Sequence, residues 1–203
     1  MVGHGAFKMD YEQMPKRNQA ALDFLLTRRS RPAKTLSLPA PDQEQLRDIL
    51  TAALRTPDHG KLEPWRLIVL TSDSLDELAS IAEACALEAQ LDASAVEKAR
   101  QPFDQGHVAV AVIEVQKPSE KIPTIEQTYS AGAVCLALLN AALAAGWGAN
   151  WLSGWASHNR SFVENGLGLS AHERMAGLIY LGTETKTPPE RPRPNLEQSV
   201  TWR

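Results

Sequence analysis

The longest apolar segment of the chain constrains the fold more than any other feature of the sequence. Pro123 can start a helix that runs to Ala145, and from Ala131 onward this helix is apolar on nearly all sides. A helix without a polar face must be covered by other elements, so we expect it to be central and buried. The run from Ala131 to Ala145 is interrupted by Asn140 and falls short of the roughly 20 residues that span a bilayer. The sequence therefore predicts a soluble protein built around one long helix.

Shorter helix and strand patterns lie on both sides of this helix. The 3.6-residue period of helices occurs in 20–27, 42–54 and 74–91, and Ser170 with Glu173 has the pattern of a short capped helix. Continuous or alternating apolar runs, typical of strands, occur at 65–70, 107–115, 148–153 and 177–182. Three or four strands separated by helices favour a three-layer sandwich of the α/β or α+β class.

The composition is that of a folded domain. The 203 residues are 43% hydrophobic and 22% charged, which supplies enough apolar side chain to offset the entropy cost of ordering. A net charge of −3 gives no general attraction to nucleic acid or to an anionic membrane, so we expect neither as a partner. We expect one domain over 20–186, preceded by an N-terminal extension, 1–19, and followed by a Pro-rich tail, 187–203, that can reach a neighbour.

Cysteine usage and the N-terminus indicate a reducing compartment. Cys85 and Cys135 lie far apart in apolar helical patterns, where we expect buried thiols rather than a disulfide or a zinc site. Residues 1–16 carry charges of both signs and no apolar core, unlike a secretory signal. The sequence predicts a cytoplasmic protein without a metal centre.

A cationic cluster follows the first predicted helix. Arg28, Arg29, Arg31 and Lys34 surround the hydroxyl of Ser30, and no acidic residue lies among them. Guanidinium groups and a hydroxyl suit a phosphate, because charged bidentate hydrogen bonds are strong and directional. The alternative is a solvated helix end, where cations complement the helix dipole.

A second candidate segment follows the second predicted helix. Arg55 and His59 flank a turn containing Pro57 and Asp58, shortly before Trp65 opens a strand. Loops held by rigid elements commonly carry ligand-binding groups, so this segment is a candidate ligand rim. Alternatively, His59 is a loop histidine bonded to the backbone, and Asp58 is a turn residue that bonds its own backbone.

The third candidate segment is rich in glycine and tryptophan. Residues 146–155 contain three of each: Gly146, Gly148, Gly154, Trp147, Trp151 and Trp155. Glycine lets the backbone approach a flat ligand, and indoles provide planar apolar walls. The spacing does not match a dinucleotide-binding fingerprint. The alternative is an aromatic core around a glycine that ends a helix.

Together these segments describe one ligand, with an anionic end for the arginines and a planar end for the glycines and indoles. This is the shape of flavin mononucleotide (FMN). The remaining histidines are far apart in the sequence, and their spacing matches neither a metal triad nor a nucleophile–base pair. We therefore assign no catalytic side chain.

The ordered motifs resemble those of the nitroreductase family of FMN flavoenzymes, most closely its small single-domain branch of NAD(P)H nitroreductases. The matching segments are 27–30, 55–59 with Pro64-Trp65, Glu126-Gln127 with Ser130-Ala131-Gly132, Trp151 with Ser153-Gly154, and 180–183. The resemblance implies an α+β fold, a three-layer α/β/α sandwich with a central, mainly antiparallel sheet. It also implies a homodimer with two FMN sites, each built from both chains.

Carried over by position, the resemblance assigns cofactor-binding roles. It implies that Arg28, Arg29 and Ser30 hold the FMN phosphate, ribityl chain and ring edge, and that Arg55 and His59 contact the flavin. It implies that Trp151, Leu152 and Ser153 run along the isoalloxazine face, with a backbone amide near Ser153 directed at flavin N5. The nicotinamide site is expected beside Ala141, Ala142, Leu143, Ala144, Ala145 and Gly146, although helix packing explains this stretch equally well.

The activity implied is an FMN-dependent oxidoreductase. It takes hydride from NADH or NADPH at flavin N5 and reduces nitroaromatic, quinone or related small-molecule acceptors by a ping-pong mechanism. Leu152 stands where close relatives carry arginine, and this favours one alternative, a flavin-binding carrier or sensor with little turnover. A second alternative is a flavin dehydrogenase of a specific metabolite in the same family.

Overall fold

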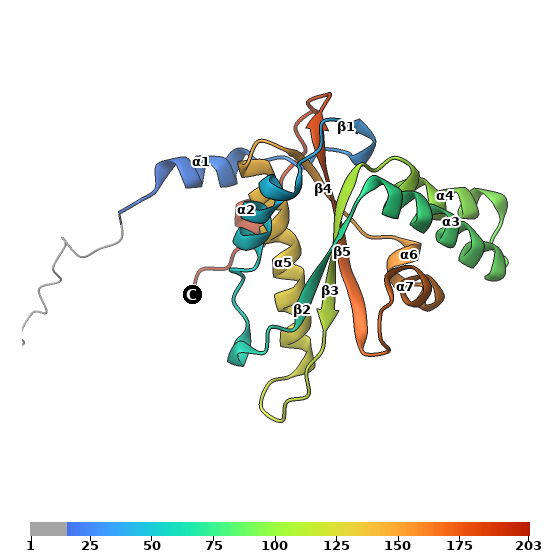
Figure 1. Ribbon diagram of the computed structural model, residues 1–203. Helices are drawn as coiled ribbons and strands as arrows, with labels where there is room; N and C mark the ends of the chain where they lie inside the picture. Colours follow the sequence, from blue (N-terminus) through green and yellow to red (C-terminus); the bar gives the residue numbers. More distant parts are fainter. Residues whose placement is uncertain (1–15) are drawn as a thin grey trace, which may run out of the picture.

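A five-stranded antiparallel sheet separates two layers of helices in the computed structural model, which describes residues 16–203 (Figure 1). The strands are β1 (Leu36–Ser37), β2 (Trp65–Leu70), β3 (Val108–Val115), β4 (Gly148–Leu152) and β5 (Glu173–Glu184). They run in the order β1-β5-β3-β2, with β4 also paired to β5, and every pairing is antiparallel. The α+β, three-layer prediction with a mainly antiparallel sheet is therefore confirmed.

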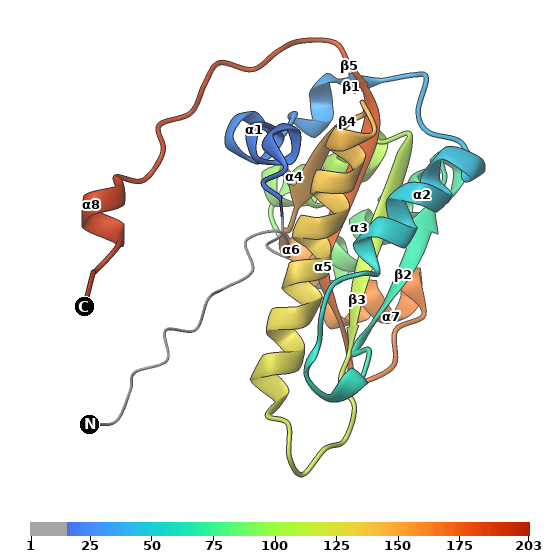
Figure 2. The ribbon, with the colours of Figure 1, turned by 90° about the vertical axis from the view of Figure 1, so that its left-hand side faces the viewer.

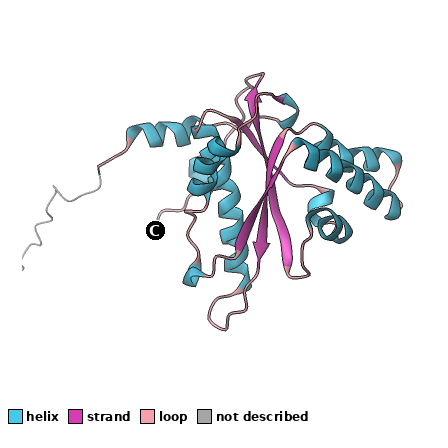
Figure 3. Ribbon diagram, in the orientation of Figure 1, coloured by secondary structure: helices cyan, strands magenta, loops and turns pink. Residues whose placement is uncertain are grey.

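The two helical layers differ in composition (Figure 3). One layer contains α2 (Gln43–Ala53) and α5 (Thr124–Ala144). The other contains α3 (Ser72–Glu88), α4 (Ala93–Asp104), α6 (Trp155–His158) and α7 (Arg160–Leu167). Two short 3-10 turns, η2 (Ala33–Thr35) and η3 (His59–Lys61), lie in the connections. The helix α1 (Gln19–Thr27) projects from the upper end of the molecule, and the tail carrying α8 (Leu196–Ser199) runs away from its body (Figure 2).

Strand β3 explains why the sheet needs cover on both faces. Val110 and Val112 are fully buried in the core on the α2 and α5 side, and Ala109, Ala111 and Ile113 are fully buried in the core on the other side. An almost continuous apolar strand of this kind is stable only between two layers. The edge strand β4 is thereby held in a fixed position beside β5.

The long helix is central but not buried all round. Its limits, Thr124–Ala144, agree with the prediction, and it has the length and hydropathy of a membrane-spanning helix. Val134 and Leu138 are fully buried against the sheet, the packing of a core helix. The expectation of burial on nearly all sides is wrong, because Ile125, Tyr129 and Leu136 are 50%, 68% and 47% exposed.

Local patterns mislead the prediction in three further places. The helix expected to start at Ser74 starts earlier, because Thr71 caps α3 and its hydroxyl accepts from the Ser74 backbone N–H. The short helix expected at Ser170 and Glu173 is a turn followed directly by β5, which begins at Glu173. Helices α4, α6 and α7 were not predicted at all.

The expected domain limits stay predictions. Residues 1–15 of the expected extension, 1–19, lie outside the described residues, and α1 begins at Gln19. The sheet ends at Glu184, and the polypeptide beyond it forms the tail.

Candidate functional site

The predicted cationic cluster lies beside the edge strand. Arg28 ends α1, and the chain then leaves the helix in an extended conformation. The backbone N–H of Arg31 donates to the carbonyl oxygen of Ala149 at 2.8 Å, so this segment lies against β4. Arg28 Nη2 donates to Ser30 Oγ at 3.0 Å, and Arg29 Nη2 donates to the carbonyl oxygen of Pro189 at 3.3 Å. The side-chain hydrogen bonds of Arg28 and Arg29 thus reach only neutral oxygens.

The electrostatics of this cluster favour an anion. Burial lowers the pKa of Arg28, and the neighbouring charges of Arg193, Arg29 and Arg31 lower that pKa further. Arg31 is compensated by Glu184, with Nε and Oε2 2.7 Å apart. The Nε atoms of Arg28 and Arg29 are buried and have no hydrogen-bond partner among the described residues. Buried donors of this kind are costly unless a ligand or water accepts from them.

Strand β4 presents consecutive side chains to opposite layers, because side chains alternate along a strand. The indole of Trp151 lies over Gly177 of β5, next to Cys135 of α5, and is 37% exposed. Leu152 packs on the other side, in the core beneath α3 and α7. The predicted residues 151–153 are therefore adjacent in space but do not form one continuous face.

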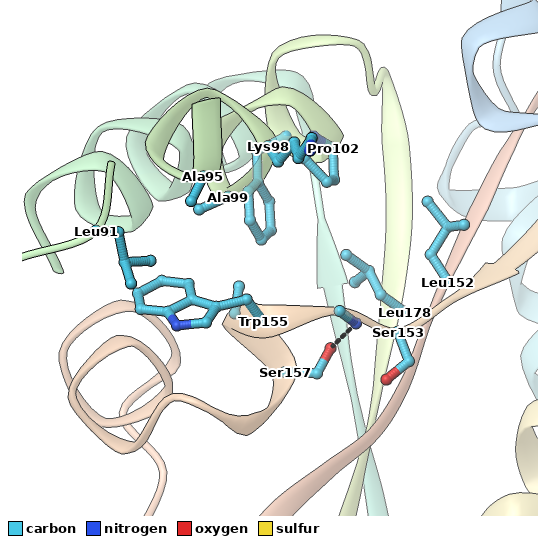
Figure 4. Close-up of a pocket in the computed structure, with 13 residues that line it drawn as sticks. Leu91, Ala95, Lys98, Ala99, Pro102, Leu152, Ser153, Trp155, Ser157 and Leu178 are labelled. Carbon is cyan, nitrogen blue, oxygen red and sulfur yellow. Dashed lines mark hydrogen bonds between the residues drawn. The ribbon is translucent and has the colours of Figure 1, made fainter. Parts of the chain in front are cut away.

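A pocket of about 490 Å³ lies on the Leu152 side of β4 (Figure 4). Ser153 and Gly154 contribute to one wall, and α4 covers the pocket from the opposite side. Gly154 N–H donates to Ser157 Oγ at 3.4 Å, and Ser153 Oγ is 3.2 Å from His158 Nε2. These contacts fix the turn after β4, the segment whose backbone the resemblance directs at a flavin.

Arg55 and His59 lie in a different place. Both are exposed, and His59 Nδ1 is 2.7 Å from Glu126 Oε2 at the N-terminal end of α5. The interpretation of His59 as bonded to the backbone is therefore wrong. Asp58 is a turn residue, because its carboxylate accepts from the backbone N–H groups of Leu62 and Glu63.

The predicted nicotinamide stretch forms the C-terminal end of α5. Ala142 is buried in the core, and Ala144, Ala145 and Gly146 are exposed. Ala145 and Gly146 border a hollow next to Asp48 of α2, in the layer opposite to the pocket beside Ser153. The structure does not bring this stretch into the pocket.

The structure thus joins two of the three predicted segments within one chain. The arginine cluster and β4 are neighbours, whereas His59 contacts the opposite, N-terminal end of α5, where the connection after α2 reaches that helix (Figure 2). Sequence reasoning missed α4 as a pocket wall, although Val96, Ala99 and Phe103 follow the helical period that marks its buried face. It also missed Arg193, which the tail places near Arg28 and which no local pattern could locate. Within residues 16–203, no group of three or more His, Cys, Asp and Glu side chains is arranged for a metal ion.

Comparison with known proteins gives a consistent assignment. The model of the Nitroreductase family matches residues 25–183. A protein of Escherichia coli strain K12 named "Putative NAD(P)H nitroreductase YdjA" is 35% identical over 163 residues, covering 80% of this chain and 87% of that protein.

Solved structures share the fold. A nitroreductase-like protein of Bacillus cereus superimposes with a TM-score of 0.74 at 21% identity, covering 93% of this chain and 98% of that one. A protein of Desulfovibrio desulfuricans, described as "a putative nitroreductase in complex with fmn", gives a TM-score of 0.70 at 21% identity, covering 90% of this chain and 95% of that one. The family match covers most of the chain, from before the arginine cluster to the last residues of β5. The chain therefore belongs to the nitroreductase family, a family of oxidoreductases.

Proposed function

We propose that this chain is an FMN-dependent NAD(P)H oxidoreductase that reduces nitroaromatic, quinone or related acceptors. The observation that carries the proposal is the pair of buried, unpartnered Nε atoms of Arg28 and Arg29 beside β4. They offer charged donors to a dianionic phosphate next to a strand whose end borders a pocket. Family membership and the FMN complex of the Desulfovibrio protein support this reading.

The residues present fit an FMN phosphate. Arg28 and Arg29 donate to the phosphate, and Ser30 supplies a hydroxyl at the same place. The backbone between Leu152 and Gly154 would hold the flavin edge, and an amide near Ser153 would supply a hydrogen bond to it. A bound FMN would supply the hydride and electron transfer, so the protein would need no acid–base pair of its own for hydride delivery. Its residues hold the ring, exclude water on one side and leave the pocket side open.

A homodimer is proposed from the exposed apolar surface. Ile125, Tyr129 and Leu136 form a stripe along α5, and Leu25 and Leu26 of α1 are 56% and 71% exposed. Trp151 adds part of its indole on the same side of the sheet. Contiguous apolar surface on a soluble protein is typical of an interface, and a second copy of the chain is the partner that the family resemblance implies.

The same geometry favours two sites that each use both chains. His59 lies at the N-terminal end of α5, and the arginine cluster adjoins β4, which follows the C-terminal end of that helix. A helix of 21 residues is about 30 Å long, more than one FMN molecule spans. His59 would therefore contact a flavin bound mainly by the partner subunit, and Arg55, which precedes it in the same connection, would approach that flavin with it.

We expect ping-pong kinetics because one pocket adjoins Ser153, where the flavin edge is proposed to lie. NAD(P)H and the acceptor both need the open face beside Ser153, so they occupy it in turn. We place this reaction in the cytoplasm, where buried free thiols such as Cys85 and Cys135 are stable.

The test begins with the absorption spectrum of the purified protein and of the apoprotein after addition of FMN. We expect stoichiometric flavin, rapid bleaching by NADH or NADPH in stopped flow, and parallel lines in double-reciprocal plots at several acceptor concentrations. A protein that stays colourless after FMN addition contradicts the proposal. Bound flavin that neither nucleotide bleaches favours the carrier or sensor, and bleaching by a metabolite alone favours the specific dehydrogenase.

A further inference from the structure

The pocket beside β4 is built by a single chain and is almost entirely apolar. Leu91 and Trp155 lie at one end, Leu152 and Leu178 lie at the other, and α4 covers the space between them (Figure 4). The remaining apolar lining residues are Ala95, Ala99, Pro102, Phe103 and Ala156. Its volume of about 490 Å³ lies within the range of small-molecule sites.

The two hydroxyl groups in the lining are already engaged. Ser157 Oγ accepts from the backbone N–H of Gly154, and Ser153 Oγ is hydrogen-bonded to His158 Nε2. Both bonds hold the turn after β4, and each uses one of the hydrogen-bonding positions of its hydroxyl. One charged side chain remains in the lining, that of Lys98.

Lys98 differs from the neighbouring cation of its helix. Arg100 contacts Glu83 and also pairs with Asp104, its Nε lying 2.9 Å from Oδ2. Lys98 is exposed at the rim of the pocket and forms no ion pair with any residue in the described part of the chain. Ala95 and Pro102 lie three and four residues away on the same face of α4, which turns Lys98 toward the pocket.

An apolar pocket with one ammonium group at its rim favours a particular kind of ligand. The body of the ligand is planar and apolar, to lie against Trp155 and the aliphatic lining, and its edge carries an acid group that reaches the ammonium. A neutral aromatic compound fits the same space but gains nothing from the charge. An acidic compound recovers Coulomb energy at the rim, where solvent keeps the gain modest.

We propose that Lys98 is a specificity-determining residue that selects aromatic acceptors bearing a carboxylate or another acidic substituent. This inference rests on the proposed function, because the pocket serves acceptors only if the flavin lies beside Ser153. A dinucleotide donor also carries negative charge, so the experiment must separate the acceptor from the donor.

The probe pair is 4-nitrobenzoate and its neutral isostere 4-nitrobenzamide, both of which quench tryptophan fluorescence. With the purified full-length protein, we expect the carboxylate to bind about fivefold more tightly than the amide. Lys98→Gln should abolish this difference by weakening only the carboxylate, and Lys98→Glu should reverse it. The preference should also shrink as ionic strength rises, since it is electrostatic.

Control variants test whether the preference for the carboxylate arises at Lys98. Lys121→Gln removes an exposed lysine of the turn before α5 that is not part of the pocket, and it should leave the ratio unchanged. Trp155→Phe keeps an aromatic wall but should lose most of the quenching. In turnover, Lys98→Gln should raise KM for 4-nitrobenzoate with little change in kcat.

The proposal is wrong if wild-type protein binds the two compounds equally, or if Lys98→Gln retains the preference. It is also wrong if the substitution changes only the KM for NADH or NADPH, because the charge then serves the donor. The proposed function is tested by a separate measurement, because its failure would appear as absence of FMN binding. The fluorescence titration does not require flavin turnover.

Discussion

At the scale of single residues, the arginine cluster gives the sharpest test of the proposed FMN site. Arg28→Ala should weaken FMN binding by about 1.5–3 kcal/mol, because a charged hydrogen bond to phosphate is worth that much. The measurement is the FMN dissociation constant from quenching of flavin fluorescence. Arg47→Ala, which removes an exposed arginine of α2, is the control and should bind FMN as the wild type does. An unchanged constant for Arg28→Ala would assign Arg28 to the solvated helix end instead.

A buried carboxylate provides a second prediction at this scale. Glu173 is 6% exposed and accepts from Arg66 Nε at 2.7 Å, from Arg66 Nη2 at 3.1 Å and from Ser170 N–H at 2.9 Å. The hydrogen bonds from Arg66, followed by that from Ser170 and the charge of Arg66, lower the pKa of Glu173 to about 2, against the opposing effect of burial. Because the folded pKa is below the unfolded one, the stabilisation is present above the unfolded value, about 4.3, and is lost as pH falls toward 2.

Glu173→Gln should therefore lower the free energy of unfolding at pH 7 by about 1–2 kcal/mol, a figure reduced for the partly exposed Arg66. The difference from wild type should shrink between pH 5 and pH 2, as measured by urea unfolding at several pH values. Glu164→Gln, which breaks an exposed pair with Arg160, should change stability by less than about 0.5 kcal/mol. A difference for Glu173→Gln that stays constant with pH would contradict the assignment.

At the scale of elements, Gly177 determines how β4 sits on β5 and α5. A Cβ atom at Gly177 would overlap the indole of Trp151 and lie 3.0 Å from Cys135 Sγ. Gly177→Ala should therefore displace the indole and lower the free energy of unfolding by about 1–3 kcal/mol, with a change in near-ultraviolet circular dichroism. The double variant with Trp151→Leu should recover part of that loss, because the smaller side chain frees the space. Strictly additive losses would show that the two residues are not in contact.

The elements also show where a sequence determines its fold locally. The helix expected over 42–54 begins with a capping box between Asp42 and Gln45, three residues apart in the sequence, and the box is present in both directions. The same pattern misled at Ser170, because the partner that decides the role of Glu173 is Arg66 on a distant strand. The exposed stripe of α5 escaped prediction for a related reason, since an apolar residue such as Leu136 fits a core and an interface equally well.

The candidate site, like the fold, could be predicted only where it depends on residues adjacent in the sequence. Adjacent motifs such as Arg28 to Ser30 could be chosen by their chemistry, and the contact of Arg31 with Ala149 then puts that segment beside β4. The contact of His59 with Glu126 and the wall formed by α4 depend on how separate elements pack. Periodicity within one element carries no information about such contacts.

At the scale of the whole molecule, the proposed dimer depends on the α5 stripe. Leu136→Glu should raise the dimer dissociation constant by about 30-fold or more, because a charge at the centre of an apolar interface is left without water or a partner. Sedimentation velocity measures the shift to monomer, and the FMN content should fall with it. Leu87→Glu changes an equally apolar, 59% exposed position on α3 in the other layer and should stay dimeric. A Leu136→Glu protein that remains dimeric with full flavin content would show that the interface does not include this stripe of α5.

The alternation of β4 has a practical consequence for engineering. Trp151 faces the layer proposed to meet the second copy, and Leu152, one position later, packs into the core beside the pocket. If the proposed site and dimer hold, libraries of variants at α4 and Leu152 should change which compounds are reduced and leave the proposed dimer intact. Changes at Trp151 would alter quaternary structure and reactivity together, so natural drift in substrate range should concentrate on the α4 side of this strand.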